Sequence, residues 1–447
     1  MTAGDDGLML ELTAERRAPL AGLVEAWLSR RSAEQQRSGE QRSPGGRGDA
    51  PVVVPGHRVE IREVEVLRAG RPGLLDVLAD VDGRGMHAVL GVRADGGGQA
   101  TDAAGDGKGL GLIHDDEGLA SVIDALRDSE LAQLVLAAVT GQEPENEVVN
   151  VVRDDDEETV VEFDSRCCLR VFPRVVEGPH RGVELLLALD EAGFNHLAAP
   201  LAVWRRGGHD LGVVQELLVG SAGGWALALT SLRDLYGSGG RPEEAGGDFG
   251  PEAQALGTMA ARMHLALDRA FGHETARVAA LAEEVEAAVT RVDPTLLQGE
   301  GAGPALGRVR ASGARVTTLR THGDFHLGRT ARTDLGWVVC DCSPGGQPPG
   351  ADGPVLRSPL ADVVDMLWSM MHVSAVASAE RDPTGRGGPT ALARAWATRN
   401  RGAFLTAYLA TPGIEELTGA DRALVLDLVT VLELERASTL VAQGQPS

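Results

Sequence analysis

Hydrophobic and polar positions divide the chain into a β-rich first half and an α-rich second half. Apolar and polar side chains alternate across residues 51–92, and strand-like runs return within 147–172 and 199–217. From Trp225 onward the apolar side chains recur at the spacing of amphipathic helices. The predicted helices of this second half cover 225–235, 252–271, 274–290, 360–377, 390–410 and 420–440. This order of elements predicts an α+β protein.

The β-rich half also contains three predicted helices. Apolar side chains have helical spacing in residues 8–30, in residues 116–140, which we interpret as one amphipathic helix, and in residues 181–192. The stretch 29–50 is rich in Arg, Gln, Ser and Gly, and it therefore predicts a loop.

The composition narrows the classes of partner. With 447 residues the chain is long enough for two or three domains, and its formal charge of −23 disfavours nucleic acid and anionic membrane surfaces. No run of about 18 apolar residues occurs, and the acidic start 1–6 lacks the layout of a signal peptide. The four cysteines show no Cys-x-x-Cys spacing, which favours reduced thiols. We expect a cytoplasmic protein that binds neither nucleic acid nor a membrane.

Two aspartates in the second half are candidates for phosphotransfer chemistry. Residues 320–328 read Arg-Thr-His-Gly-Asp-Phe-His-Leu-Gly, and the apolar run Trp337–Cys340 is followed by Asp341. A phosphotransferase needs one carboxylate to accept the proton of the attacking hydroxyl and another to hold the magnesium that bridges the nucleotide phosphates. The spacing indicates Asp324 for the first task and Asp341 for the second. Because a lone aspartate after a strand is more often a cap or turn residue, this interpretation depends on the surrounding motifs.

Three other segments extend the pattern. Residues 178–194 contain Glu184 and end in Glu-Ala-Gly-Phe, residues 214–217 read Val-Gln-Glu-Leu, and residues 358–363 read Ser-Pro-Leu-Ala-Asp-Val. Together with the two aspartates, these segments resemble the actinobacterial maltokinases and related sugar kinases, including glucosamine kinases, that carry an N-terminal cap. The resemblance runs over residues 16–440, within a few residues at either end.

The resemblance implies a protein-kinase-like two-lobed fold of the aminoglycoside-phosphotransferase type. Its parts are an N-terminal cap subdomain with mobile loops over 1–112, an intermediate helix with the β-rich N-lobe over 113–219, and a helical C-lobe over 220–447. It also implies ATP and Mg²⁺ as cofactors, and transfer of the γ-phosphoryl group to a hydroxyl of a small-molecule sugar, which in maltokinases is the anomeric one. A functional link to trehalose or glycogen enzymes is implied by the family alone.

The resemblance also implies roles for single residues. Asp324 is the implied catalytic base and Asp341 the implied magnesium ligand. The implied nucleotide-binding residues are Arg170, Glu184, Gln215, Glu216 and Leu217. Asp362 is implied to brace the catalytic turn, with capping of its own helix as the alternative. His322 and His326 are expected to orient the turn by hydrogen bonds rather than to bind metal, because their spacing of four suits zinc only on a helix.

Several positions depart from the family pattern. Arg329 stands where the family has Gln or Asn as a second magnesium ligand; a guanidinium has no lone pair for a metal, and it would touch phosphate instead. Arg170 stands at the family's lysine position, where a planar guanidinium does not reproduce the contacts of a compact ammonium group. Residues 154–159 read Asp-Asp-Asp-Glu-Glu-Thr where small polar residues approach the triphosphate, so these carboxylates either repel it or point elsewhere. Segments 341–346 and 439–440 also differ from the family pattern. The identity of the sugar substrate therefore cannot be inferred from the family.

Three functions remain open from the sequence. The first is an ATP- and magnesium-dependent sugar kinase of the maltokinase type, in which Asp324 deprotonates the hydroxyl. The second is a catalytically degenerate protein that keeps the fold as a binding or regulatory module, and Arg329 and the acidic residues 154–158 favour it. The third is a phosphotransferase for an amino sugar or an aminoglycoside-like substrate, which the acidic surface favours if that surface lines the cleft.

Overall fold

The computed structural model describes most of the chain. The described residues are 8–9, 14–42, 57–94, 109–115, 118–143, 148–164, 166–244, 247–299, 301–342, 355–381, 390–419 and 421–442. Residues 343–346, part of the segment in which the sequence departs from the family after Asp341, lie outside these ranges.

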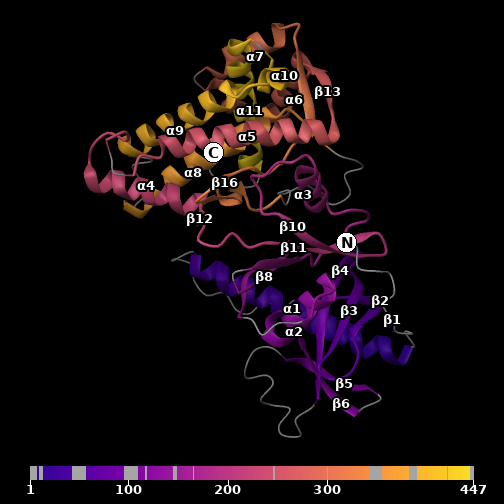
Figure 1. The fold of residues 1–447 in the computed structure, drawn as a ribbon. Coiled ribbons are helices and arrows are strands. Elements are labelled where there is room, and N and C mark those ends of the chain that lie inside the picture. Colours follow the sequence, from indigo (N-terminus) through magenta and orange to yellow (C-terminus); the bar gives the residue numbers. More distant parts are fainter. Residues whose placement is uncertain are drawn as a thin grey trace. The chain divides into compact units, whose positions relative to one another are not determined.

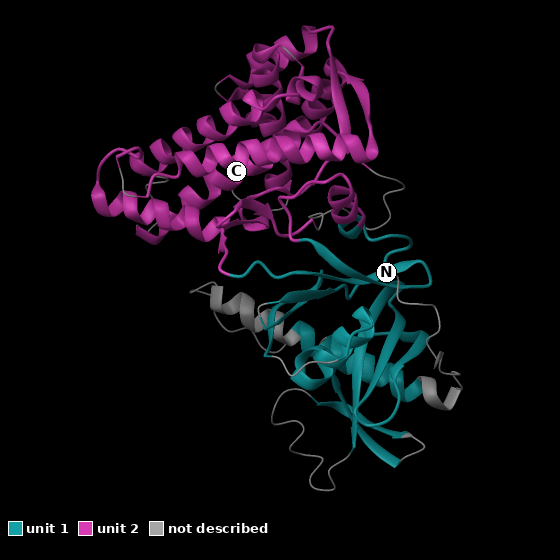
Figure 2. Ribbon diagram, in the orientation of Figure 1, with its two compact units in different colours: residues 1–183, 199–219 teal, residues 184–198, 220–447 magenta. Residues whose placement is uncertain are grey.

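The chain packs into two compact units (Figure 2). Unit 1 comprises residues 1–183 and 199–219, and unit 2 comprises residues 184–198 and 220–447. Segment 184–198 therefore packs with the α-rich unit, although the chain on both sides of it belongs to unit 1. The division of the first half into a cap and an N-lobe at residue 112 stays a prediction.

Unit 1 contains a six-stranded antiparallel sheet with the first helix packed against it (Figure 1). Its strands, in spatial order, are β1 (Leu8–Met9), β2 (Val59–Arg68), β3 (Gly73–Val81), β4 (Arg84–Ala94), β6 (Gly118–Asp124) and β5 (Gly109–Asp115). Helix α1 (Ala14–Arg42) packs on this sheet because its apolar side chains Leu23 and Trp27 join one buried cluster with Val64 and Val77 of the strands. The helix runs on into the stretch 29–50, so the loop predicted there is wrong up to Arg42.

A five-stranded antiparallel sheet completes unit 1. Its spatial order is β10 (Pro200–Arg206), β11 (His209–Glu216), β9 (Cys167–Val171), β8 (Thr159–Phe163) and β7 (Val149–Asp154). Helix α2 (Ser129–Thr140) buries Leu131 and Val135 in one cluster with Phe163, Leu169 and Leu211 of these strands. The predicted strand runs 147–172 and 199–217 are therefore confirmed, because apolar residues point from each strand into this core.

A buried ion-pair network joins the two sheets within unit 1. Asp76 of β3 and His87 of β4 are fully buried, and Asp76 Oδ1 lies 2.8 Å from His87 Nε2. The other carboxylate oxygen of Asp76 lies 2.9 Å from a guanidinium nitrogen of Arg206 in β10. Removal of one partner from such a network leaves a charge without compensation in a dry interior. The network therefore fixes the two sheets to each other.

The predicted helix over 116–140 is wrong in its first half. The structure has strand β6, a 3₁₀ turn over Ala125–Arg127, and only then α2. Strand β6 pairs with both β4 and β5, so its apolar side chains are held in a sheet. Two capping aspartates mark the change: Asp124 accepts from the backbone N–H of Leu126, and Asp128 accepts from that of Leu131, each at 3.1 Å.

Unit 2 is built mainly of helices (Figure 1). They are α3 (Arg181–Glu191), of which unit 2 has the part from Glu184, α4 (Gly224–Ser238), α5 (Gly250–Phe271), α6 (Val278–Val292), α7 (Ala302–Ala311), α8 (Leu360–Arg381), α9 (Ala391–Ala410), α10 (Ile414–Thr418) and α11 (Arg422–Ala442), with a 3₁₀ turn over Pro294–Gln298. The helix predicted over 274–290 begins only at Val278, because residues 273–277 form a strand instead.

Two small sheets lie among the helices of unit 2. One has the order β12 (Ala222–Gly223), β15 (Thr330–Thr333) and β16 (Gly336–Val339), and the other has the order β13 (His273–Arg277), β14 (Arg315–Arg320) and β17 (Leu356–Arg357). The candidate aspartates follow β14 and β16 in the chain, so both sheets position the site.

Helix α8 is largely buried within unit 2. Among the described residues it is the one helix that is long and apolar enough to cross a membrane by length and composition, but 72% of its most apolar window is buried inside the structure. This is the burial of a core helix in a folded protein.

Candidate functional site

The first candidate aspartate lies on a sharp turn that follows β14. At Gly323 the backbone has φ +82°, a conformation that residues with a Cβ rarely adopt, and this places glycine between His322 and Asp324. The N–H groups of His322 and Gly323 each donate to the carboxylate of Asp362, at 2.8 Å. Phe325 is fully buried and anchors the turn on its other side. The turn is therefore held by two charge-assisted hydrogen bonds and one buried ring.

Asp362 ties this turn to the helical core. It lies in the first turn of α8, is fully buried, and also lies 3.0 Å from Nε2 of His264 in α5. The other ring nitrogen of His264 lies 2.8 Å from the hydroxyl of Tyr408 in α9. Burial raises the pKa of Asp362, but the hydrogen bond and charge of His264 outweigh it, and the pKa lies below its ordinary value. Asp362 is thus held as a carboxylate, the form that accepts from the turn.

His322 connects the two candidate aspartates through their backbones. Its Nε2 lies 2.8 Å from the carbonyl oxygen of Asp341, and its Nδ1 accepts from the N–H of Asp324 at 3.3 Å. Because burial lowers the pKa of His322, the ring is neutral at neutral pH, with its proton on Nε2. The geometry gives His322 an orienting role.

A hairpin of β15 and β16 positions the second candidate aspartate. Thr330 pairs with Val339 at the open end of the hairpin, and the N–H of Cys340 donates to the carbonyl of Arg329 at 2.9 Å. This pairing places Arg329, just before β15, beside Asp341, just after β16. At Gly224 of α4 an added Cβ would lie 2.5 Å from Oγ1 of Thr330, so α4 packs directly against this end of the hairpin.

Arg329 lies between the two candidate aspartates and contacts both. Its Nε and one terminal nitrogen donate to Oδ2 of Asp324 at 3.1 and 2.8 Å, and its other terminal nitrogen donates to Oδ2 of Asp341. Arg329 and Asp341 are each only 7% exposed. One guanidinium therefore bridges both carboxylates in a mostly dry environment, where such contacts are strong.

His326 lies on the other side of Asp324. Its Nδ1 accepts from the N–H of Gly328 at 3.0 Å, and its Nε2 lies 3.4 Å from Oδ2 of Asp324. Burial raises the pKa of Asp324, but His326 and then Arg329 outweigh burial, so the pKa of Asp324 lies below its ordinary value. Asp324 is therefore ionised at neutral pH. We call Asp324, His326, Arg329 and Asp341 the turn cluster.

The turn cluster does not fit the magnesium ion that the family resemblance implies. Mg²⁺ requires oxygen ligands in near-octahedral geometry, whereas Oδ2 of Asp341 and Oδ2 of Asp324 both accept from Arg329. Among the described residues, no group of three or more His, Cys, Asp or Glu side chains could hold a metal ion. The guanidinium of Arg329, itself a cation, contacts both carboxylates.

Arg170, one of the implied nucleotide-binding residues, belongs to a second arginine–carboxylate cluster, which lies in unit 1. Nε of Arg170 in β9 donates to Oε2 of Glu158 at 2.8 Å, and a terminal nitrogen of Arg170 lies 3.4 Å from Oε1 of Gln215 in β11. Glu158 is 2% exposed and also accepts from Arg153 at 2.7 Å. The acidic hairpin between β7 and β8 thus turns Glu158 inward onto arginines. We call Arg153, Glu158 and Arg170 the hairpin cluster.

Two other arginines of unit 1 pair with Asp154 of the acidic hairpin. Arg31 of α1 pairs with Asp154 and donates to Oγ1 of Thr159 at 2.9 Å, and Arg127 pairs with Asp154 as well. Asp155 accepts from the N–H groups of Glu157 and Glu158 and so shapes the tip of the hairpin. The structure pairs carboxylates of residues 154–158 with arginines of unit 1. Both possibilities for a triphosphate, repulsion or carboxylates that point elsewhere, stay predictions.

The backbone N–H groups at the implied adenine position are engaged within unit 1. The N–H of Glu216 donates to the carbonyl of Ala199 at 2.9 Å, and that of Leu217 donates to the carbonyl of Arg166 at 3.0 Å. A role of these residues in binding adenine stays a prediction.

Glu184 is bound to an arginine that sequence reasoning missed. In unit 2, Arg320 donates to both carboxylate oxygens of Glu184, at 2.7 and 2.5 Å, and stacks 4.0 Å over the ring of Phe271. Arg320 is the residue before the Thr-His-Gly-Asp motif, so this pair fastens α3 to the strand that leads into the turn. No sequence pattern links two residues 136 positions apart.

A second missed residue, Asp365, lies one turn after Asp362 on α8. Burial raises the pKa of Asp365 to about 7, against the effect of Arg436, whose Nε lies 3.3 Å away. The charges of Asp362 and Asp324 also raise it. His264 and Asp365 could have been suspected from the sequence, because each is a polar residue on the apolar side of a predicted helix.

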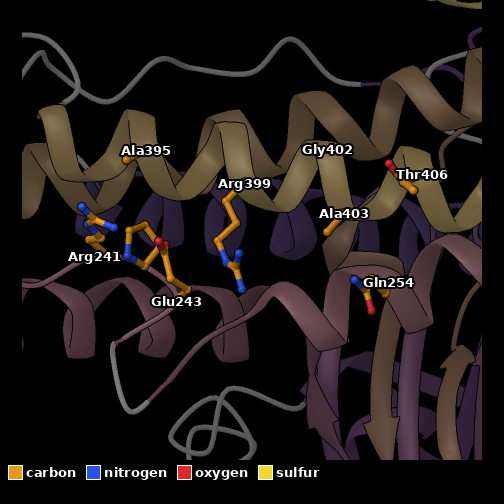
Figure 3. A pocket seen from close by; sticks show the side chains of 9 residues that line it. Arg241, Glu243, Gln254, Ala395, Arg399, Gly402, Ala403 and Thr406 are labelled. Carbon is orange, nitrogen blue, oxygen red and sulfur yellow. The ribbon is translucent and has the colours of Figure 1, made fainter.

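A hollow of about 610 Å³ lies elsewhere on unit 2 (Figure 3). It is lined by Arg241, Pro242, Glu243, Gln254, Ala395, Arg399, Gly402, Ala403 and Thr406, and none of the predicted site residues takes part. Arg399 of α9 donates to both oxygens of Asp248, at 3.0 and 2.6 Å. This ion pair holds the loop before α5 against α9. The arginine at the hollow therefore has a structural role.

Two relatives found by comparison with known proteins are glucosamine kinases. The chain is 29% identical over 391 residues to a glucosamine kinase of Streptacidiphilus jiangxiensis, covering 82% of this chain and 83% of the relative. It is 27% identical over 244 residues to a glucosamine kinase of Mycolicibacterium smegmatis, covering 50% and 58%. No protein-family model matches the chain.

Among solved structures, the chain is similar to a glucosamine kinase in complex with glucosamine, ADP and inorganic phosphate. The TM-score is 0.58 at 21% identity, and the match covers 88% of this chain and 90% of the other. A second structure of glucosamine kinase, crystal form A, gives a TM-score of 0.57 at 22% identity, and the match covers 90% of each chain. The predicted two-lobed, protein-kinase-like α+β fold is therefore confirmed.

Proposed function

We propose that this protein is a phosphotransferase that moves a phosphoryl group from a nucleotide to a hydroxyl of an amino sugar. The observation that carries the proposal is the ionised carboxylate of Asp324 on a turn fixed by Asp362 and His322. The similarity to glucosamine kinases over most of both chains supports the class of substrate.

The proposed reaction makes limited demands on the protein. Asp324 accepts the proton of the attacking hydroxyl, a bond forms between that oxygen and the transferred phosphorus, and the bond from phosphorus to the leaving phosphate oxygen breaks. Because the transition state of phosphoryl transfer is loose, the carboxylate mainly orients the hydroxyl, and positioning supplies most of the catalysis. A rigid turn is what such positioning requires.

The amino-sugar alternative replaces the maltose reading as the favoured one. The relatives found are glucosamine kinases, and a structural neighbour is described with glucosamine and ADP. ATP as donor belongs to the proposal. The link to trehalose or glycogen enzymes came with the maltokinase resemblance and has no support of its own.

The experiment is a phosphoryl-transfer assay followed by ³¹P NMR, with ATP as donor and glucosamine, maltose and an aminoglycoside as acceptors. We expect transfer to glucosamine, and a loss of about 10²–10⁴-fold when Asp324→Asn removes the proton acceptor. Asp334→Asn is the matched control, because Asp334 is an exposed aspartate in the turn between β15 and β16 and takes no part in the turn cluster. Equal rates for wild type and folded Asp324→Asn would contradict the proposal.

A second candidate function is a non-catalytic binding module. The ion pairs of Arg329 with both aspartates favour it, as do the engaged N–H groups of Glu216 and Leu217. Under this reading the protein transfers no phosphoryl group to any of the three acceptors, and Asp324→Asn leaves ligand binding unchanged. The same assay, with calorimetric binding of glucosamine as its companion, separates the two.

A further inference from the structure

The chemistry at Asp324 and Asp341 requires positive charge, and the turn cluster already contains it. In phosphoryl transfer, cations neutralise the charge of the phosphates, and metal ions and arginines both serve. Here the cation between the carboxylates is part of the chain, because Arg329 donates to Oδ2 of Asp324 and to Oδ2 of Asp341.

Arg329 is fixed in this position by its backbone as well as by its charge. Its N–H donates to the carbonyl of His326 at 2.9 Å, and its carbonyl accepts from the N–H of Cys340 at 2.9 Å. The side chain is mostly buried. To reach Asp341, a divalent cation would have to shed tightly bound water and also displace a guanidinium from two carboxylates.

We propose that Arg329 replaces the divalent cation in this protein, so that Asp324 and Asp341 bind no Mg²⁺ and the phosphoryl donor binds free of metal. The statement that the phosphoryl donor binds without metal rests on the proposed function. One guanidinium carries one positive charge where Mg²⁺ carries two. Substitution of Arg329 by Asn removes this charge, supplies an amide oxygen, and should convert the pair of carboxylates into a cation site.

The first test measures binding of Mn²⁺, as a probe for Mg²⁺, by electron paramagnetic resonance on the full chain. Wild type and Asp341→Asn should bind Mn²⁺ equally, since only the acidic surface takes it up. Arg329→Asn should gain a site that Arg329→Asn/Asp341→Asn loses, and Mn²⁺ should raise the Tm of Arg329→Asn alone. Uptake by wild type that Asp341→Asn removes would overturn the inference, as would a folded Arg329→Asn without a new site.

Two control variants test whether position and charge are responsible. Arg332→Asn removes a nearby arginine of β15 that pairs with Glu252 at 3.1 Å and not with the two aspartates, so it should create no site. Arg329→Lys keeps a positive charge and should create none either. If Arg329→Asn does not fold, the comparison of wild type with Asp341→Asn decides the question by itself.

The second test measures binding of ATP and ADP by calorimetry, in EDTA and in Mg²⁺. We expect equal affinity of the wild type under both conditions, and for Arg329→Asn an affinity about tenfold or more higher in Mg²⁺ than in EDTA. Binding by wild type only in Mg²⁺ would overturn the inference and leave the proposed function intact. No nucleotide binding under any condition would contradict the proposed function, and the Mn²⁺ result would then decide the inference.

Discussion

Two arginines, Arg170 in unit 1 and Arg329 in unit 2, stand where the family resemblance implied other residues. Each of them is paired with a buried carboxylate. Arg170 in the hairpin cluster contacts Glu158, which comes from the turn before the adjacent strand β8. Arg329 in the turn cluster contacts Asp324 and Asp341, the two residues for which chemistry was predicted. The residue type and the kind of partner are the same in both places, but the partners have different expected roles.

This difference shows that the effect of an arginine substitution depends on the role of the carboxylate that the arginine binds. Glu158 and Arg170 neutralise each other inside unit 1, with Arg153 as a second cation. Arg329 instead engages the proton acceptor and the implied metal ligand together. Loss of Arg170 therefore disturbs local packing, whereas loss of Arg329 alters the charge on the candidate catalytic residues.

The largest expected effect is that of Arg329→Ala on the stability of unit 2. The variant leaves Asp341 and Asp324 without their shared guanidinium in a mostly buried place, and breaking a buried pair in this way costs about 3–5 kcal/mol. Hydrogen exchange should increase in peptides covering 320–342, and the thermal transition should fall. Peptides of the hairpin 149–171 should exchange as in the wild type.

Arg332→Ala is the control for this prediction. Arg332 and Glu252 are each about a third exposed, so their pair is worth about 0–1 kcal/mol. If Arg329→Ala were no more destabilising than Arg332→Ala, the bridge across the two aspartates would be contradicted.

The second prediction separates two carboxylates, one from each unit, by their response to pH. The pKa of Asp365 is raised by burial to about 7, so the folded state binds its proton more tightly than the unfolded state does. Its contribution is fully present at low pH and is lost as pH rises from about 4 to about 7, by about 2–4 kcal/mol. Asp365→Asn should remove this slope from the unfolding free energy of unit 2.

Asp155 at the tip of the acidic hairpin should respond in the opposite direction. Burial raises its pKa, but the hydrogen bond from Arg153 and those from the backbone outweigh burial, and the pKa lies below 3.8. Its contribution is present above that value and is lost as pH falls through the lowered pKa. Hydrogen exchange of 149–163 and of 360–381 between about pH 2 and 8, corrected for the intrinsic exchange rate, would show the contrast, and parallel profiles would contradict it.

The smallest expected effect is that of Arg170→Lys. An ammonium keeps the charge beside Glu158 but loses the second contact, to Gln215, so the cost should be about 0.5–1.5 kcal/mol. The measurement is the thermal transition of unit 1, with Arg174→Lys as control, because Arg174 pairs only loosely with Asp156 at 3.5 Å. A loss as large as that of Arg329→Ala would mean that the two clusters do not differ as described.

The sequence predicted the fold correctly where the local spacing of apolar residues determines the secondary structure. Alternation in 147–172 and 199–217 predicted the strands, and helical spacing predicted α5, α9 and α11 within a few residues. The prediction was wrong where pairing with a strand from a distant part of the sequence determines the secondary structure. Residues 118–124 and 274–277 fall within predicted helices, yet each is part of a strand because a neighbouring strand pairs with it. Pairing between distant segments overrides local preference.

The candidate site shows the same limit at the level of side chains. The motif around Asp324 predicted a turn that its own glycine and histidine shape, and the structure has that turn. The sequence identified Arg329 as a departure but not its contact with both aspartates, because that contact depends on the register of β15 and β16. Glu184 was expected to act with the nucleotide, and its pairing with Arg320 had no signal in the sequence.

The membership of segment 184–198 in unit 2 has a consequence for the synthesis of the chain on the ribosome. Unit 1 has all its residues once 219 has emerged, but α3 finds its partner for Glu184 only at Arg320, 136 residues later. Arg320 emerges 101 residues after residue 219, which at about 5–20 residues per second takes roughly 5–20 s. During that time the apolar residues Leu185, Leu186 and Leu189, buried in the finished protein, lie on a loop that leaves a completed domain. We expect this loop to be cleaved by protease in nascent chains halted before residue 320 and protected in the released protein, which makes it the natural place for a chaperone to bind.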